Sequence, residues 1–172
     1  MRDQMGLSSE APLCPWHYAD TLNVIVFEAT DLDLDPEHAE QLLVKDSSSW
    51  SGMTLFEEGV YVVVLNSAHS RERRAATLMH ELAHIILEHV PADVDVSPSG
   101  LVLLSDFSRD QEDEADWLGG ALLLPEAALT KSRYSGISII DIAKKYGVSE
   151  QLCSWRCKMT GVEKRLSFRQ RS

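Results

Sequence analysis

The sequence predicts an α+β fold with a small antiparallel sheet, a long helix that carries an H-E-x-x-H motif, and helix-turn-helix-like helices near the C-terminal end. Short runs of β-branched residues predict the strands. Apolar residues at helical spacing surround the motif and recur after it. A chain of 172 residues fits one domain, or one domain with a small appendage. We expect a domain at residues 1–130 and a basic helical segment at residues 131–172 that packs on it.

The first elements are expected to be a helix, a strand and a second helix. Residues 12–22 predict a helix because Pro12 suits a first turn and the apolar residues that follow recur at helical spacing. Residues 23–27 read Asn-Val-Ile-Val-Phe, which is typical of a short strand. Residues 36–44 predict a second helix that Asp35-Pro36 opens.

A β-hairpin is expected before the motif. Residues 53–57 and 61–65 favour strands, and Glu58-Gly59 favours a turn between them. If the second strand lies at the sheet edge, it can bind an extended peptide by strand addition. The alternative is an interior strand, and the sequence does not separate the two.

The remaining chain predicts helices divided by one long loop. Ser70 is an N-cap candidate for a helix that runs to about His89. Residues 91–105 predict a loop because Pro91, Pro98 and Gly100 interrupt regular structure. A helix at residues 111–124 is closed by Pro125, and helices at 138–146 and 149–160 are joined by a tight turn at Gly147.

The motif His80-Glu81-Leu82-Ala83-His84 predicts a metal site. Residues four apart share one helix face, so His80 and His84 can bind one tetrahedral zinc ion, with one zinc expected per chain. Glu81 follows the first histidine and can act as general base toward a bound water. The motif lies in an almost wholly apolar helix, where buried histidines and a glutamate need partners or a metal.

A catalytic zinc needs a third protein ligand, and the acidic segment 111–117 offers the candidates. Glu112 and Asp116 share a face above the small residues Ala115 and Gly119. We assign Glu112 as the ligand and Asp116 as the hydrogen-bond acceptor for the far nitrogen of a ligand histidine. Glu114 is the alternative ligand. Manganese or iron can also occupy such a donor set.

Other histidines and the cysteines predict no further site. A three-histidine metalloprotease has its third ligand at the position of Val90 and a glycine at that of Leu87, so we expect His89 to be a surface residue at the helix end. Three cysteines are most simply reduced thiols. The first residues enter no apolar run and no segment is long enough to span a bilayer, so we expect a cytoplasmic protein without a signal peptide.

Charge is distributed unevenly along the chain. The net charge is −11, yet the last part of the chain is rich in lysine and arginine. Acidic residues before it should repel nucleic acid, so only the basic segment can attract DNA. We favour a packing or partner-docking role for that segment, while direct DNA binding stays possible.

The motif and the segment from Glu112 to Pro125 resemble the ImmA/IrrE family of metallo-endopeptidases, whose pattern is H-E-x-x-H followed by E-x-x-A-[ND]-x-F-A-x-x-L-L-x-P. Leu118 and Gly119 depart from it by replacing the usual phenylalanine and alanine. The resemblance covers roughly residues 13–165. It implies a zincin-like domain with metal ligation by His80, His84 and Glu112 and catalysis by Glu81.

The resemblance also implies a substrate, a helix-turn-helix transcriptional repressor whose cleavage relieves repression. The leading hypothesis is therefore a zinc-dependent endopeptidase. One alternative is a metal-bound protein that acts by binding a regulator or toxin partner without hydrolysis, and another is a DNA-binding regulator that uses the basic tail. Tyr134 and Tyr61 are guesses for the side chain that stabilises the oxyanion.

Overall fold

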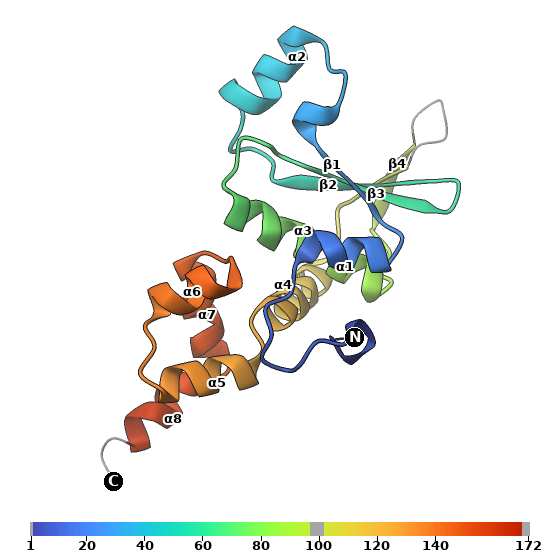
Figure 1. Ribbon diagram of the computed structural model, residues 1–172. Helices are drawn as coiled ribbons and strands as arrows, with labels where there is room; N and C mark the ends of the chain where they lie inside the picture. Colours follow the sequence, from blue (N-terminus) through green and yellow to red (C-terminus); the bar gives the residue numbers. More distant parts are fainter. Residues whose placement is uncertain (1, 97–101, 170–172) are drawn as a thin grey trace.

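The computed structural model describes residues 2–96 and 102–169, in which a small sheet lies above a set of helices (Figure 1). The α-helices are α1 (Pro15–Thr21), α2 (Pro36–Glu40), α3 (Arg71–Ile86), α4 (Arg109–Leu123), α5 (Glu126–Tyr134), α6 (Ile139–Tyr146), α7 (Glu150–Met159) and α8 (Val162–Arg169). The strands are β1 (Ile25–Glu28), β2 (Gly52–Glu57), β3 (Val60–Leu65), β4 (Asp93–Val96) and β5 (Val102–Ser105). Shorter turns are η1 (Arg2–Met5), η2 (Ala29–Asp31) and the π-helical η3 (Gln41–Lys45).

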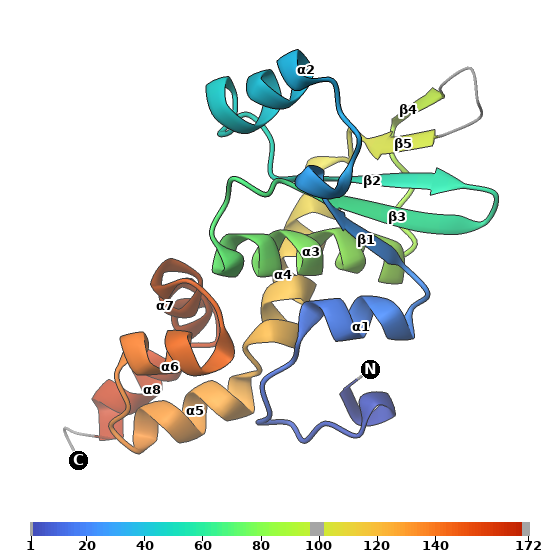
Figure 2. The same ribbon diagram turned by 45° about the horizontal axis from the view of Figure 1, so that its top comes forward.

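The five-stranded sheet has the order β1-β3-β2-β5-β4. The α+β class is confirmed, but the sheet is mixed and not all antiparallel, because β1 runs parallel to β3. Between these two strands the chain makes a long excursion through α2 and β2, which is the kind of crossover that parallel pairing requires. Helices α1 and α3 lie along one side of the sheet and α2 lies on the other (Figure 2).

The β2–β3 hairpin is confirmed, with Glu58 and Gly59 both at positive φ in the turn (49° and 87°). Strand β3 lies between β1 and β2, so of the two positions that the sequence left open the interior one holds. Its residues Val63 and Leu65 are fully buried. A buried strand of this kind has no free edge for a peptide.

The loop predicted for residues 91–105 is wrong within the described residues. Strands β4 and β5 form an antiparallel pair there, and Leu104 of β5 pairs with Thr54 of β2. The predicted breakers Pro98 and Gly100 lie outside the described residues. Pairing of β5 with β2, which is distant in sequence, and of β4 with β5 makes these segments strands despite the nearby prolines.

The ends of α1 and α3 differ from the expected ones by a few residues, and each end has a local cause. Pro15, and not Pro12, occupies the first turn of α1. Ser70 caps α3 by accepting a hydrogen bond from the Arg73 amide at 3.3 Å. Helix α3 ends at Ile86, three residues before the expected end, and Glu88 adopts a left-handed conformation with a φ of 54°.

The C-terminal part contains the expected helix pair and two helices that were not predicted, α5 and α8. Ser138 and Ser149 cap α6 and α7, and Gly147 ends α6 with a φ of 64°. Apolar residues from the sheet, α3, α4 and these helices form one continuous core. Among the described residues, the helices lack the length and apolar character that crossing a membrane requires.

Candidate metal centre

Helix α3 carries the motif through the centre of the fold. Apolar side chains within the motif and directly before it are completely buried, namely Leu78, Met79, Leu82 and Ala83. His80 and His84 lie one turn apart, so their rings leave α3 on the same side. The His84 side chain is 3% exposed and that of His80 is 24% exposed. Polar rings at such depth need hydrogen-bond or metal partners.

Helix α4 brings Glu112 to the two histidines. Ser108 and Gln111 form a reciprocal capping box at its start, with hydrogen bonds of 3.3 Å and 2.9 Å. Further along, α4 passes close to α3 because Gly119 has no side chain. A Cβ at that position would lie 3.2 Å from the carbonyl oxygen of Met79.

The distances between the three side chains fit a tetrahedral metal ion. Nε2 of His80 lies 3.0 Å from Nε2 of His84, and the Glu112 carboxylate lies 3.2 Å and 3.5 Å from these nitrogens. Zinc bonds of about 2.0–2.1 Å at tetrahedral angles separate neighbouring ligand atoms by about 3.3 Å. Lone pairs that face one point repel each other unless a cation lies between them. The three side chains can therefore hold one metal ion.

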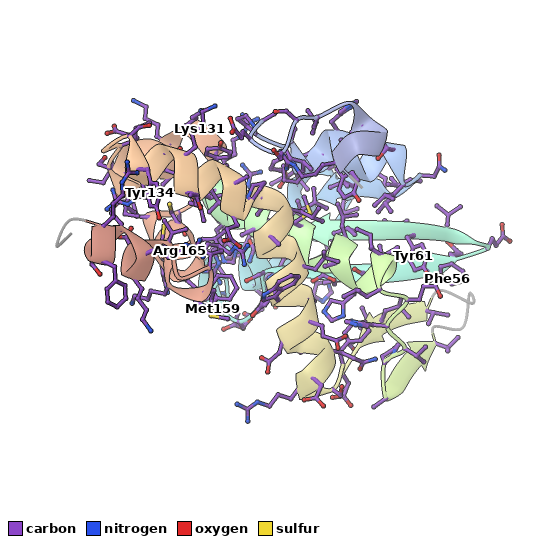
Figure 3. The ribbon with its side chains drawn as sticks, turned by 90° about the horizontal axis from the view of Figure 1, so that it is seen from below. Phe56, Tyr61, Lys131, Tyr134, Met159 and Arg165 are labelled. Atoms are coloured by element: carbon purple, nitrogen blue, oxygen red, sulfur yellow. The ribbon has the colours of Figure 1, made fainter. Side chains whose placement is uncertain are left out.

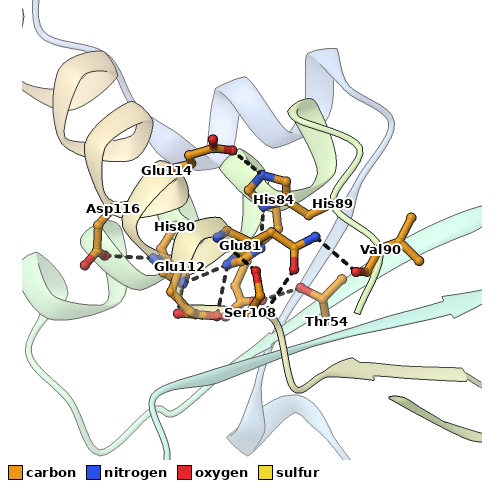
Figure 4. A network of polar contacts seen from close by, with 11 residues as sticks. Thr54, His80, Glu81, His84, His89, Val90, Ser108, Glu112, Glu114 and Asp116 are labelled. Carbon is orange, nitrogen blue, oxygen red and sulfur yellow. Dashed lines mark hydrogen bonds and ion pairs between the residues drawn. The ribbon is translucent and has the colours of Figure 1, made fainter. Parts of the chain in front are cut away.

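Asp116 lies on the other side of the His80 ring. Its Oδ1 is 2.9 Å from Nδ1 of His80, which leaves Nε2 directed toward Glu112 (Figure 4). Burial opposes the charged form of His80, but Asp116 and the neighbouring carboxylates outweigh it and raise the pKa of His80 above its ordinary value. The same hydrogen bond lowers the pKa of Asp116.

His84 is held among rings. The Phe107 ring stacks on it with a centroid distance of 3.9 Å, and His89 Nδ1 lies 3.0 Å from His84 Nδ1. Burial and the nearby imidazoles of His80 and His89 lower the pKa of His84 to about 4. His84 is thus neutral near pH 7 and has a lone pair to offer a metal. The expectation that His89 is a surface residue is wrong, because its side chain is only 6% exposed.

Glu81 points toward β2. Its Oε2 accepts a hydrogen bond of 2.5 Å from the hydroxyl of Thr54, which is itself buried. Burial raises the pKa of Glu81 above its ordinary value, against the effects of Thr54 and His80. A carboxyl with a raised pKa is suited to accept a proton and return it.

Glu114, the alternative ligand, lies outside the three-residue cluster. Its Oε2 is 3.1 Å from Nε2 of His89, on the far side of His84 from Glu112.

The two tyrosines suggested as oxyanion-stabilising residues lie in different parts of the molecule. Tyr134 lies among the C-terminal helices, whereas Tyr61 lies on the sheet (Figure 3). Tyr61 lines a cavity that His84 and Thr54 share, and Tyr134 is not among the residues of that cavity.

A cavity of about 370 Å³ opens at the cluster. It contains His80, Glu81, His84 and Glu112 from the helices, together with Gly52 and Met53 from the start of β2 and the segment from Leu103 to Phe107. The sequence did not indicate Thr54, Phe107 or His89 as neighbours of the motif. His89 had a local signal in the sequence, its position five residues after His84.

Helices α3 and α4 of this α+β domain cross and bring together two histidines and a glutamate that could hold a metal ion. This arrangement is typical of metal-dependent hydrolases. A family model described as the IrrE N-terminal-like domain, peptidase family M78, matches residues 45–158. The match covers more than half of the chain and includes the whole cluster, so the chain belongs to this family of metallopeptidases. No curated protein and no solved structure matches the chain.

Proposed function

We propose that the protein is a zinc-dependent endopeptidase that hydrolyses a peptide bond in a cytoplasmic protein, a helix-turn-helix transcriptional repressor, and so relieves repression. Membership of a peptidase family supports hydrolysis of a protein. The observation that carries the proposal is the position of Glu81, which lines the same cavity as His80, His84 and Glu112. The repressor as substrate rests on the family resemblance.

His80, His84 and Glu112 are the proposed zinc ligands, and Asp116 is proposed to hold His80. When bound, zinc supplies a Lewis acid that lowers the pKa of a water and polarises the scissile carbonyl. Glu81 takes the proton from the attacking water and then passes it to the leaving amine. Thr54 holds one oxygen of Glu81 at 2.5 Å, and we assign this transfer to the other oxygen.

The sheet offers a place for the substrate backbone beside Glu81. Gly52 and Met53 pair with β3 on one side, whereas the pairing of β2 with β5 begins only at Thr54. The other edge of Gly52 and Met53 is therefore unpaired among the described strands, and both residues line the cavity. An extended peptide bonded to this short edge would pass the Glu81 carboxylate.

The test compares wild type with Glu81→Gln on a purified helix-turn-helix repressor encoded beside the protein. Glu81→Gln keeps the shape of the side chain but cannot shuttle a proton, so we expect cleavage to fall by at least about 100-fold with zinc content unchanged. Mass spectrometry of the fragments and metal analysis measure the two effects. Glu72→Gln, at an exposed position of α3, is the matched control.

The opposite outcome points to the binding alternative. If Glu81→Gln relieves repression in cells as well as wild type does, hydrolysis is not the function. Relief without hydrolysis would mean that the protein acts by binding its partner.

A further inference from the structure

The chain returns to the motif directly after α3 ends. The left-handed conformation of Glu88, with a φ of 54°, turns the backbone so that the His89 amide donates to the carbonyl of His84 at 3.0 Å. The His89 side chain is consequently packed against the His84 ring, with 6% of its surface exposed. This placement is specific, because a histidine at a frayed helix end would extend into solvent.

His89 makes polar contacts with both of its ring nitrogens. Nδ1 lies 3.0 Å from Nδ1 of His84, and Nε2 lies 3.1 Å from Oε2 of Glu114 (Figure 4). The three side chains form a row that ends at an exposed carboxylate, because the Glu114 side chain is 65% exposed. His89 is attached to the opposite nitrogen of His84 from the one that faces His80 and Glu112, so it is not itself a ligand.

The order of donors and acceptors in this row determines which ring nitrogen of His89 and of His84 carries a hydrogen. An ionised carboxylate only accepts hydrogen bonds, so Nε2 of His89 carries the hydrogen that points to Glu114. The Nδ1 of a neutral His89 is then an acceptor, and Nδ1 of His84 must donate to it. Nε2 of His84 is left with its lone pair, directed toward His80 and Glu112. The reverse order would place a hydrogen on this nitrogen and block a metal.

We propose that His89 and Glu114 are positioning residues that hold His84 in the tautomer and orientation that bind the metal. This inference rests on the proposed metal site. His80 has the same kind of support in a shorter form, because Asp116 contacts its Nδ1 directly at 2.9 Å. Among the described residues, the polar contact at Nδ1 of His84 is with His89 and not with a carboxylate, and His89 connects that nitrogen to Glu114. Outer partners of this kind typically change metal affinity by about 10–100-fold.

The main experiment measures the zinc dissociation constant by competition with a chromogenic chelator. His89→Phe keeps a ring in the pocket but removes the acceptor, and we expect zinc binding about 10–100-fold weaker than in wild type. His89→Asn retains an oxygen near the position of Nδ1 and should recover part of the loss. His38→Phe, at an exposed position of α2, is the control and should bind zinc like wild type.

Substitutions of Glu114 test the same row of side chains without changing the protein interior. We expect Glu114→Ala to weaken zinc binding by several fold, because His89 can then carry its hydrogen on either nitrogen. Glu114→Gln should bind more tightly than Glu114→Ala, since its amide oxygen still accepts from His89. The side chain is largely exposed, so neither change threatens folding.

A second readout uses the metal-free protein and does not depend on the proposed function. Nitrogen-15 NMR of the imidazole rings should find the hydrogen of His84 on Nδ1 in wild type and a mixture of both tautomers in His89→Phe. Wild-type zinc affinity in His89→Phe, together with an unchanged His84 tautomer, would overturn the inference. If wild type itself binds no zinc, the proposed metal site fails, and the tautomer measurement still decides whether His89 orients His84.

Discussion

Helix α4 contacts two different helices through two neighbouring glycines. Gly119 faces α3, where an added Cβ would lie 3.2 Å from the Met79 carbonyl oxygen and 3.4 Å from the His80 amide nitrogen. Gly120 faces α7, where an added Cβ would lie 2.8 Å from the Trp155 ring and 2.9 Å from Cδ of Arg156. The first contact is between backbones, and the second is between a backbone and side chains.

This difference distinguishes the proposed metal centre, on the α3 side of α4, from the C-terminal helices on its α7 side. Backbones have no rotamers to adjust, so the α3 contact fixes the spacing between the histidines of α3 and Glu112 of α4. Side chains at the α7 contact can repack. Arg156 is buried there with its guanidinium 5.9 Å and 5.8 Å from the ring centroids of Trp117 and Trp155.

The largest expected effect is the loss of zinc when Glu112, on the α3 side of α4, is removed. We expect wild type to bind about one zinc per chain, and Glu112→Ala and His84→Ala to retain none after dialysis, because a site with two protein ligands holds zinc poorly. Elemental analysis of the purified proteins measures this. Asp113→Ala, one residue further along α4, should keep its zinc. Retention in Glu112→Ala alone would instead make Glu114 the third ligand.

The two glycines provide a matched pair of smaller effects. Gly120→Ala overlaps the Trp155 ring, so we expect the free energy of unfolding to fall by about 1 kcal/mol, after a helix-propensity gain of about 1 kcal/mol is subtracted from the packing cost. Its zinc affinity should stay unchanged. Gly119→Ala should change stability by less than about 1 kcal/mol but weaken zinc binding by up to about tenfold, because α3 must shift by a few tenths of an ångström. Urea unfolding and chelator competition measure the two quantities.

The opposite pattern of zinc affinities in the two glycine variants would contradict the separate roles of the α3 and α7 contacts. If Gly120→Ala weakened zinc binding and Gly119→Ala did not, the α7 contact would control the metal centre. A loss of affinity in both variants would mean that α4 moves as one rigid body.

Local patterns explain why much of the site was predictable. The spacing of His80 and His84 determines that they share a face, and the same rule places Asp116 one turn after Glu112. Ser70, Ser138 and Gly147 mark helix ends because each supplies a group or a conformation that the end of a helix needs.

Contacts between distant segments account for what was missed. Thr54 meets Glu81 only because β2 pairs with β3 in one register and lies over α3. His89 reaches His84 through a left-handed residue that no glycine or asparagine announced. Arg156 belongs to the basic segment at residues 131–172, yet packing against α4 buries it. Such features depend on tertiary structure, which local propensity does not contain.

The smallest effect is expected for the basic residues of α6. Lys144 and Lys145 are exposed, but Arg156 is buried, and Arg133 and Arg165 pair with Glu163 and Glu126. Helix α7, which would have to enter a DNA groove, turns Cys153, Arg156 and Cys157 into the protein.

We therefore expect Lys144→Ala/Lys145→Ala to change the free energy of unfolding by less than about 0.5 kcal/mol and to leave repressor cleavage unaltered. Fluorescence anisotropy with a labelled duplex should detect no binding by wild type at physiological salt. Salt-dependent binding that the double variant loses would instead identify α6 as a DNA contact, because each lysine bound to a phosphate contributes to the salt dependence. The net charge of −11 opposes the approach of a phosphate backbone, which favours a packing segment over a DNA-binding one.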